Sequence, residues 1–404
     1  MPLSSYQTRL FLFLSVATFF EGYDFMALAQ ILPNLRADFA LSKEDAGWLV
    51  AAINIGTILA YLLVRQADRW GRRPVLTVTI TGYTVCSFFS GLAVGPIDFA
   101  ILQLLARVFL IGEWAVAMVY AAEEFPDERR GMVIGVIQAS AALGAIVCAG
   151  VVPLLLRTPV GWRAVYFVGA APLVIIAVAR RGLRETARFS AQRAHGLPSS
   201  ALLRVWRSPY RRRILQMALI WGLTYVCTQT AIVFWKEFAV GERGFSDAQV
   251  GQSMSLAALA SMPLVFYAGR LLDIIGRRWG AVLIFGTTSA GVLGAYTLHG
   301  QFLLTLALMV GIFGTSAVLP VLNAYNAELF PTELRADAFA WANNLLGRTA
   351  YVAAPIAVGH IAERTGWGPA VAVTAVAPLV ALGLIWLLLP ETRGRTLEET
   401  ASME

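Results

Sequence analysis

Twelve long apolar segments run along the chain, and they constrain its fold more than any other feature. We place them at 10–32, 46–64, 74–94, 97–120, 132–156, 163–180, 213–238, 248–268, 280–299, 302–326, 336–361 and 369–389. A helix needs about 20 mostly apolar residues to cross the hydrocarbon core of a bilayer, and each segment has about that length. The segments are continuous rather than alternating in hydropathy, so we expect an all-α membrane protein and not a β-barrel.

Composition excludes several other classes of protein. Of the 404 residues, 58% are hydrophobic and only 14% are charged, whereas soluble domains are about 25% charged. A cytosolic enzyme, a nucleic-acid-binding protein and a secreted disulfide scaffold are therefore disfavoured. The three cysteines and three histidines lack metal-ligand spacing, and we find no nucleophile–base pair and no phosphate-binding loop. We expect no metal, no cofactor and no enzymatic activity.

The distribution of basic residues predicts the orientation in the membrane. An even number of spans puts both termini on one side, and the loops on that side hold 23 of the 32 Lys and Arg residues, against seven on the other side. Because cytoplasmic loops carry the excess of Lys and Arg, both termini are expected in the cytoplasm. We expect an integral protein of a bacterial inner membrane, and a monomer.

The sequence repeats itself at an offset of 205 residues. The segment 64–73, after the second span, matches 269–278, after the eighth; 123–131 matches 328–336; and Gly161-Trp162 matches Gly366-Trp367. Near the ends of the two halves, Glu185-Thr186 matches Glu391-Thr392 at an offset of 206. Such self-similarity is the signature of an internal structural repeat.

Six spans return the chain to its starting side, so the two halves are parallel repeats. Among membrane folds this predicts two six-helix bundles around a central cavity that opens alternately to either side. The expected organisation is an N-terminal bundle at 1–180, a cytoplasmic linker at 181–212, a C-terminal bundle at 213–390 and a cytoplasmic tail at 391–404.

The repeated loop motif resembles the signature of the major facilitator superfamily, Gly-x-x-x-Asp-(Arg/x)-x-Gly-Arg-Arg, with Val64 in place of the first glycine of copy one. Shorter motifs resemble particular branches. Gly22-Tyr23-Asp24 is similar to sugar porters and aromatic-acid:proton symporters, and Gly112-Glu113-Trp114 is similar to metabolite:proton symporters. The tail from Leu389 to Glu398 resembles sugar porters and organic-ion transporters, and Gly347-Arg348…Pro355 resembles organic-anion carriers. The resemblance implies a secondary transporter, and favours a proton-coupled importer over a drug exporter.

Four charged residues lie near the expected membrane midplane. They are Glu21 and Asp24 in the first span, Arg107 in the fourth and Arg348 in the eleventh. A lone charge at that depth costs several kcal/mol, so these side chains should face a wet cavity or each other. Glu21 and Asp24 are three residues apart and share a helix face. Protonation of the acid would release Arg107 and deprotonation would restore the pair, and the resemblance favours Asp24 as this acid. Glu21 is expected to be either a second titrating group or a substrate contact. The alternative is a static ion pair between two spans.

Arg348 is expected to anchor a substrate carboxylate, because a guanidinium matches the planar carboxylate group. The alternative is an ion pair with Glu21 or Asp24. Aromatic and amide side chains that could complete the substrate site are Tyr23, Gln138, Tyr225, Gln229, Asn343, Asn344 and Tyr351.

The repeated loops are expected to form a cytoplasmic gate that holds the halves together when the carrier opens outward. Its expected members are Asp68, Gly71, Arg72, Arg73, Glu123 or Glu124, Arg130, Asp273, Gly276, Arg277, Arg278, Glu328 and Arg335, with Glu391 and Arg393 in the same network. Purely topological arginines are the alternative, but they would not explain the repeated Asp and Gly.

The expected function is import of a small organic anion, a carboxylate that can carry an aromatic ring, together with protons. Alternatives are a sugar or polyol:proton symporter or an exporter of the same fold, and a membrane sensor that has lost transport. The expected partners are the small-molecule substrate, protons and the lipid bilayer, with no nucleic acid.

Overall fold

The computed structural model describes residues 4–170, 184–186 and 202–394, and within these ranges the secondary structure is entirely helical. In the N-terminal half the helices are α1 (Ser5–Asp38), α2 (Lys43–Val64), α3 (Ala67–Trp70), α4 (Arg72–Ser90), α5 (Pro96–Glu124) and α6 (Asp127–Leu155). A further helical stretch begins at residue 163. The remainder of the expected sixth span, most of the expected linker and the end of the tail lie outside the described residues.

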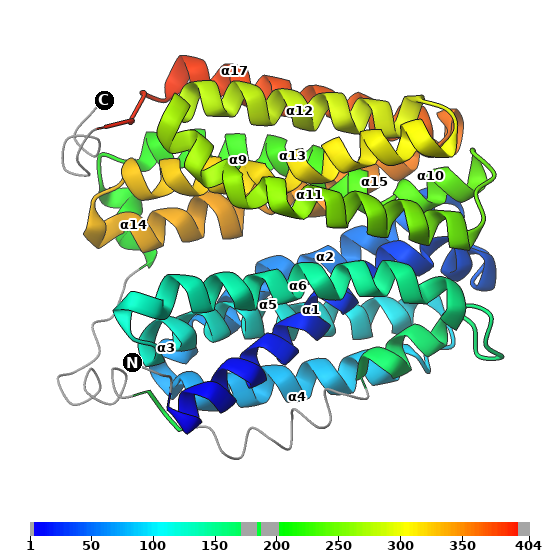
Figure 1. The fold of residues 1–404 in the computed structure, drawn as a ribbon, viewed down its shortest axis with the longest axis horizontal. Coiled ribbons are helices and arrows are strands. Elements are labelled where there is room, and N and C mark those ends of the chain that lie inside the picture. Colours follow the sequence, from blue (N-terminus) through cyan, green and yellow to red (C-terminus); the bar gives the residue numbers. More distant parts are fainter. Residues whose placement is uncertain (1–3, 171–183, 187–201, 395–404) are drawn as a thin grey trace. The chain divides into compact units, whose positions relative to one another are not determined.

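Within the described residues, the helices of the C-terminal half are interrupted more often than those of the N-terminal half (Figure 1). It comprises the 3-10 helix η2 (Leu202–Arg207), α9 (Arg211–Val233), α10 (Trp235–Gly241), α11 (Asp247–Ile275), α12 (Arg277–Thr297), α13 (Gln301–Glu328), α14 (Thr332–Phe339), the π-helix η3 (Ala340–Gly347), α15 (Thr349–Thr365), α16 (Trp367–Ala372), the 3-10 helix η4 (Val373–Ala375) and α17 (Val376–Leu388).

Eight helices in the described residues are long and apolar enough to cross a membrane, or up to ten if two bent helix pairs each form one span. One of these pairs is α9 with α10, which bend by 42° at Phe234. The expected third span corresponds to α4, a helix of 19 residues that is not among the eight. Its many threonines and serines explain its lower hydropathy.

The chain divides into two compact units, Met1–Ala40 with Ala52–Ser199, and Leu41–Ala51 with Ser200–Glu404. Each unit has its own apolar core. Leu14, Ile80 and Tyr120 belong to the first core, and Trp221 and Phe285 belong to the second.

Helix pairing is the same in the two units, as a parallel repeat requires. In the first unit α1 packs on α6 and α4 packs on α5. In the second unit the equivalent partners meet, since α9 packs on η3 and α15, and α12 packs on α13. The chain thus repeats the same packing as well as the same sequence.

Glycines allow the closest of these helix contacts. A Cβ atom on Gly22 of α1 would lie 1.9 Å from the carbonyl oxygen of Ala141, and one on Gly144 of α6 would lie 1.8 Å from that of Phe19. Neither position can carry a side chain unless the backbones move apart. The crossing of α1 and α6 therefore fixes the helix that carries Glu21 and Asp24.

Candidate functional site

Glu21, Asp24 and Arg107 are all buried inside the first unit. The Ser87 hydroxyl of α4 donates a hydrogen bond of 3.3 Å to Asp24 Oδ1. The Arg107 guanidinium lies over the ring of Phe25, 4.8 Å from its centroid, and acts electrostatically on both acids. The expected grouping of the two acids of α1 with the arginine of α5 is therefore present in this unit.

The two expected substrate contacts of the first unit, Tyr23 and Gln138, contact other parts of that unit. The Tyr23 hydroxyl donates to the carbonyl oxygen of Val165 at 3.3 Å, and its ring would be 3.1 Å from a Cβ on Gly169. Tyr23 thus packs on the helical stretch that begins at residue 163. The amide of Gln138 is exposed and donates to the Met118 sulfur at 3.9 Å.

Glu113 is a further buried acid of this cluster. It is not among the site residues expected from the sequence. Its side chain is on α5, and it acts electrostatically on Glu21. The Gly112-Glu113-Trp114 motif drew attention to this position as a mark of resemblance, but its burial could not be read from a helix that is apolar on most faces.

Four expected substrate contacts lie together in the second unit. The Tyr225 hydroxyl donates to Asn343 Oδ1 at 2.5 Å and also interacts with the Arg348 guanidinium. The rings of Tyr225 and Tyr351 meet edge to face with centroids 4.5 Å apart. A tyrosine pair, an amide and a guanidinium are thus gathered within one unit, where they can hold a planar anion by hydrogen bonds and ring contacts.

The π-helix η3 positions this group. The Arg348 N–H donates to the carbonyl oxygen of Asn343, five residues back, at 3.1 Å. Gly347 permits the tight turn, because a Cβ there would lie 2.7 Å from the Ala342 carbonyl oxygen and 2.9 Å from Trp221 Cβ. Single π-helical turns are frequent at functional sites, where they rotate side chains out of the α-helical register. The remaining amides are Gln229, which is buried on α9, and Asn344, which is half-buried in η3.

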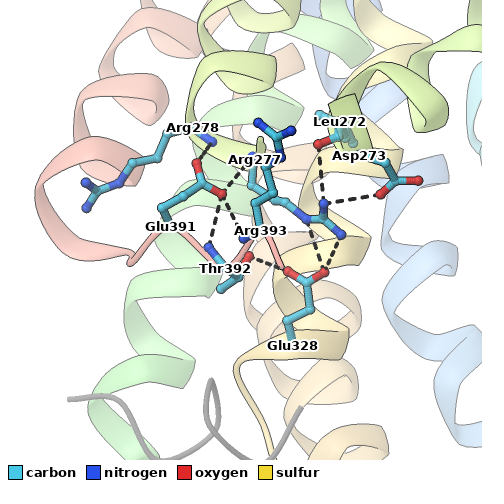
Figure 2. Close-up of polar contacts among 8 residues, drawn as sticks. All are labelled: Leu272, Asp273, Arg277, Arg278, Glu328, Glu391, Thr392 and Arg393. Carbon is cyan, nitrogen blue, oxygen red and sulfur yellow. Dashed lines mark hydrogen bonds and ion pairs between the residues drawn. The ribbon is translucent and has the colours of Figure 1, made fainter. Parts of the chain in front are cut away.

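The C-terminal copy of the loop motif forms a dense polar network (Figure 2). Glu328 accepts hydrogen bonds from Arg277 Nε at 3.1 Å, from Arg277 Nη2 at 2.7 Å and from the Thr392 hydroxyl at 2.5 Å. Arg277 also reaches Asp273 at 3.2 Å. The network joins the start of α12 to the end of α13 and to the segment after α17.

Glu391 completes this network at the N-terminus of α12. Its carboxylate accepts the backbone N–H groups of Arg277 and Arg278, each at 2.9 Å. Gly276 has φ of 89°, and a Cβ there would lie 3.0 Å from Glu391 Oε2. Burial raises the pKa of Glu391, but the hydrogen bonds from four backbone N–H groups outweigh it and the pKa lies below its usual value. A carboxylate also complements the positive end of a helix.

The N-terminal copy makes the same contacts. Arg72 Nη2 lies 3.2 Å from Glu123, and the Thr186 hydroxyl donates to Glu123 at 2.5 Å. Glu185 accepts the N–H groups of Arg72 at 3.0 Å and Arg73 at 3.3 Å. Gly71 has φ of 105°. Of the two acids expected in the gate, Glu123 contacts Arg72. The side chain of Asp68 lies outside the described part of the structure.

Other expected gate residues act on backbone carbonyls or lie beside the network. Arg130 donates to the Phe125 oxygen at 3.4 Å, and Arg335 donates to the Phe330 oxygen at 3.3 Å. These contacts again correspond at an offset of 205. The backbone oxygen of Glu124 accepts the Gln7 amide at 3.0 Å. Arg278 donates to the Leu389 oxygen, and the Arg393 N–H donates to Glu391 at 3.1 Å.

Glu185, Thr186 and Thr392 are residues of the two networks for which the sequence alone indicated no role. A signal was present, since Glu185-Thr186 and Glu391-Thr392 repeat each other. Each threonine holds the second oxygen of the acid that the arginine contacts, and so orients that acid.

These features define a class of protein, namely membrane-spanning carriers built from two helical repeats with a charged motif in corresponding loops. The family model of the Major Facilitator Superfamily matches residues 14–263 and 222–403, and the chain belongs to this family. It is therefore a transporter and not an enzyme.

Comparison with individual proteins supports the same assignment. The chain is 26% identical over 386 residues to a protein described as a probable 4-methylmuconolactone transporter of Cupriavidus pinatubonensis, covering 94% of this chain and 89% of that protein. It is 24% identical over 439 residues to the niacin transporter NiaP of Acinetobacter baylyi, covering 98% and 97%. The partially occluded, inward-open structure of the xylose transporter XylE from E. coli superposes with a TM-score of 0.79 at 18% identity, covering 97% and 100%. The expected twelve-helix, two-bundle fold is thereby confirmed.

Proposed function

We propose that this transporter imports a small organic anion, a carboxylate that can carry an aromatic ring, together with protons. The observation that carries the proposal is the group formed by Arg348, Tyr225, Asn343 and Tyr351 in the second unit. A guanidinium binds a carboxylate with two parallel hydrogen bonds, and two tyrosine rings give an aromatic body a surface to stack on. A neutral sugar does not require the guanidinium.

The acid cluster of the first unit supports proton coupling. Glu21 and Asp24 are buried beside Arg107, and a charge in the membrane interior is costly unless it is paired or neutralised. Proton binding to Asp24 releases Arg107, and loss of the proton restores the attraction. In alternating access, this change would couple the proton to the conformational step.

Names of the related proteins agree with this substrate class. Niacin is an aromatic carboxylic acid, and one relative is described as a niacin transporter. Another is described as a transporter of a muconolactone. From these relatives we apply only the substrate class, a small acidic metabolite, to this protein.

We further propose that both termini face the cytoplasm, in a bacterial inner membrane, and that the two loop networks form the cytoplasmic gate. The excess of arginine on that side supports this orientation. Each network ties the start of one membrane helix to the end of another, so it can stabilise one conformation of its bundle. The halves are proposed to be 1–180 and 213–390, with 181–212 as the linker.

Uptake into proteoliposomes tests the proposal. Wild-type protein should accumulate nicotinate or benzoate above the level reached in protein-free liposomes when the lumen is made alkaline, and a protonophore should abolish the accumulation. Xylose serves as the neutral control. Accumulation of xylose with no uptake of any acid would favour the sugar symporter instead. Accumulation of acid that ignores the pH gradient would overturn proton coupling.

Individual residues separate the two parts of the mechanism. Asp24→Asn should abolish accumulation while leaving some exchange of substrate across the membrane. Arg348→Ala should weaken carboxylate binding most. If Asp24→Asn accumulates substrate like the wild type, its coupling role is wrong; unchanged affinity for every acid in Arg348→Ala would exclude the anchor.

A further inference from the structure

Glu113 is the buried acid of the first unit to which the proposed function gives no role. Its side chain is 2% exposed, and it lies six residues after Arg107 on α5. Glu21, on α1, is 7% exposed, and its Oε2 atom has no hydrogen-bond partner. Unpaired buried carboxylate oxygens are costly, so the position calls for a functional explanation.

Contacts at both ends establish that α1 and α5 run antiparallel. The Gln7 amide near the start of α1 donates to the Glu124 oxygen at the end of α5, at 3.0 Å. Beyond the other end of α1, the ring of Phe39 meets that of Phe99 in the first turn of α5, with centroids 6.3 Å apart. The two helices therefore run in opposite directions, and the Arg107 guanidinium over the ring of Phe25, 4.8 Å from its centroid, sets their register near the acids.

This register places the charged residues on three levels. From the Gln7–Glu124 contact, Asp24 and Arg107 are each 17 residues along their helices, which is about 26 Å at 1.5 Å per residue. Glu21 and Glu113 are 14 and 11 residues along, or about 21 and 17 Å. Glu21 thus lies between the level of Asp24 and Arg107 and the level of Glu113, which is the nearest of the three to the N-terminus of α1.

The charges on these levels act on each other. Glu113 and Arg107 both act on Glu21 electrostatically. The phenol of Tyr83 on α4 interacts electrostatically with Asp24, Glu113 and Glu21. Two carboxylates in a dry interior repel each other, and a proton held between them removes one of the two charges.

We propose that Glu21 and Glu113 form a second proton site, which receives the transported proton from Asp24 on its way to the side of the termini. This step rests on the proposed function. In the transfer, the O–H bond of protonated Asp24 breaks and an O–H bond forms on a carboxylate oxygen of Glu21. The negative charge thereby moves to Asp24, where Arg107 neutralises it. Glu113 shares the proton with Glu21 until it leaves toward the termini.

Glu113→Gln tests the proposal because it keeps the side-chain shape and removes the titratable group. Proton-driven accumulation should fall about tenfold or more. Exchange of labelled for unlabelled substrate at equal pH, which needs no net proton movement, should persist. Glu113→Asp should recover part of the accumulation. The exposed Glu333→Gln on α14 is the matched control and should behave like the wild type.

Two results would overturn the proposal. One is a Glu113→Gln variant with the accumulation ratio and pH profile of the wild type. The other is a parallel loss of exchange and accumulation in both Glu113→Gln and Glu113→Asp, which indicates a structural role. An infrared spectrum makes the test independent of transport: a carboxylic-acid C=O band present in the wild type should be altered in Glu113→Gln. If the wild type shows no proton-driven uptake, the proposed function fails, and this band alone decides whether Glu21 and Glu113 hold a proton.

Discussion

The ion pair between Arg277 and Glu328 offers a prediction whose size can be worked out from the structure. Both side chains are largely buried, with 16% and 15% of their surfaces exposed, and two nitrogens of Arg277 donate to one oxygen of Glu328. Hydrogen bonds to charged groups contribute about 1.5–3 kcal/mol. Breaking a fully buried pair costs about 3–5 kcal/mol.

Glu328→Gln should therefore destabilise the protein by about 2–3 kcal/mol, since the slight exposure lets solvent screen part of the loss. Asp273→Asn is the matched control, because Asp273 contacts the same guanidinium at 3.2 Å but is 70% exposed. An exposed pair contributes about 0–1 kcal/mol. The two substitutions remove contacts to one arginine, but Glu328 is more buried and also accepts two hydrogen bonds from Arg277 and one from Thr392.

Denaturant unfolding in mild detergent measures both variants. A double-mutant cycle with Glu328→Gln and Arg277→Gln should give a coupling energy above 1 kcal/mol, within the range found for residues in contact. If Asp273→Asn costs as much as Glu328→Gln, or if the cycle shows no coupling, burial is not what gives this pair its strength.

Three further predictions concern packing, pH and substrate binding. Gly22→Ala should destabilise the first unit by about 1–3 kcal/mol, because the added Cβ would meet the Ala141 oxygen. Gly135 has open space around it, so Gly135→Ala should not destabilise the protein; equal losses of thermal stability in the two variants would contradict the assigned helix crossing. The folded-state pKa of Glu391 is lowered, so its stabilising contribution is present above the usual glutamate pKa and is lost as pH falls through the folded-state value. The wild type should therefore lose more stability on acidification than Glu391→Gln does, and parallel pH profiles would exclude this contribution. Arg348→Lys should bind carboxylates more weakly than the wild type because a lysine lacks the planar fork; unchanged binding in equilibrium dialysis would count against a two-point contact.

The sequence predicted the fold well because the fold depends on patterns that repeat, and the same repeat marks the residues of the loop networks. Apolar segment length sets the spans, and the offset of 205 residues identified the Asp, Gly and Arg positions in each half. The contacts of Arg72 with Glu123 and of Arg277 with Glu328 follow this offset closely. Corresponding sequences in a parallel repeat adopt corresponding contacts.

The direction in which a side chain points inside a bundle was harder to predict. Residue number gives the depth of Tyr23 and Asp24, yet the first packs on the stretch beginning at residue 163 and the second contacts α4. Successive residues differ by about 100° around a helix, and an all-apolar helix gives no pattern that distinguishes its faces. For this reason the sequence did not predict that Glu113 lies buried beside Glu21. The π-helix before Arg348 was also not predicted; Gly347 at its end lies close to Trp221, which is far away in the sequence.

The most direct test of the account is the proton movement that accompanies the substrate. Wild-type proteoliposomes in a weakly buffered medium should take up protons when nicotinate or another transported carboxylate is added, and the outside pH should rise. Asp24→Asn should give no such rise while still binding the acid. Carboxylate uptake with no change in outside pH, or an equal pH change in Asp24→Asn, would contradict the central claim that the buried acids of the first unit couple protons to transport.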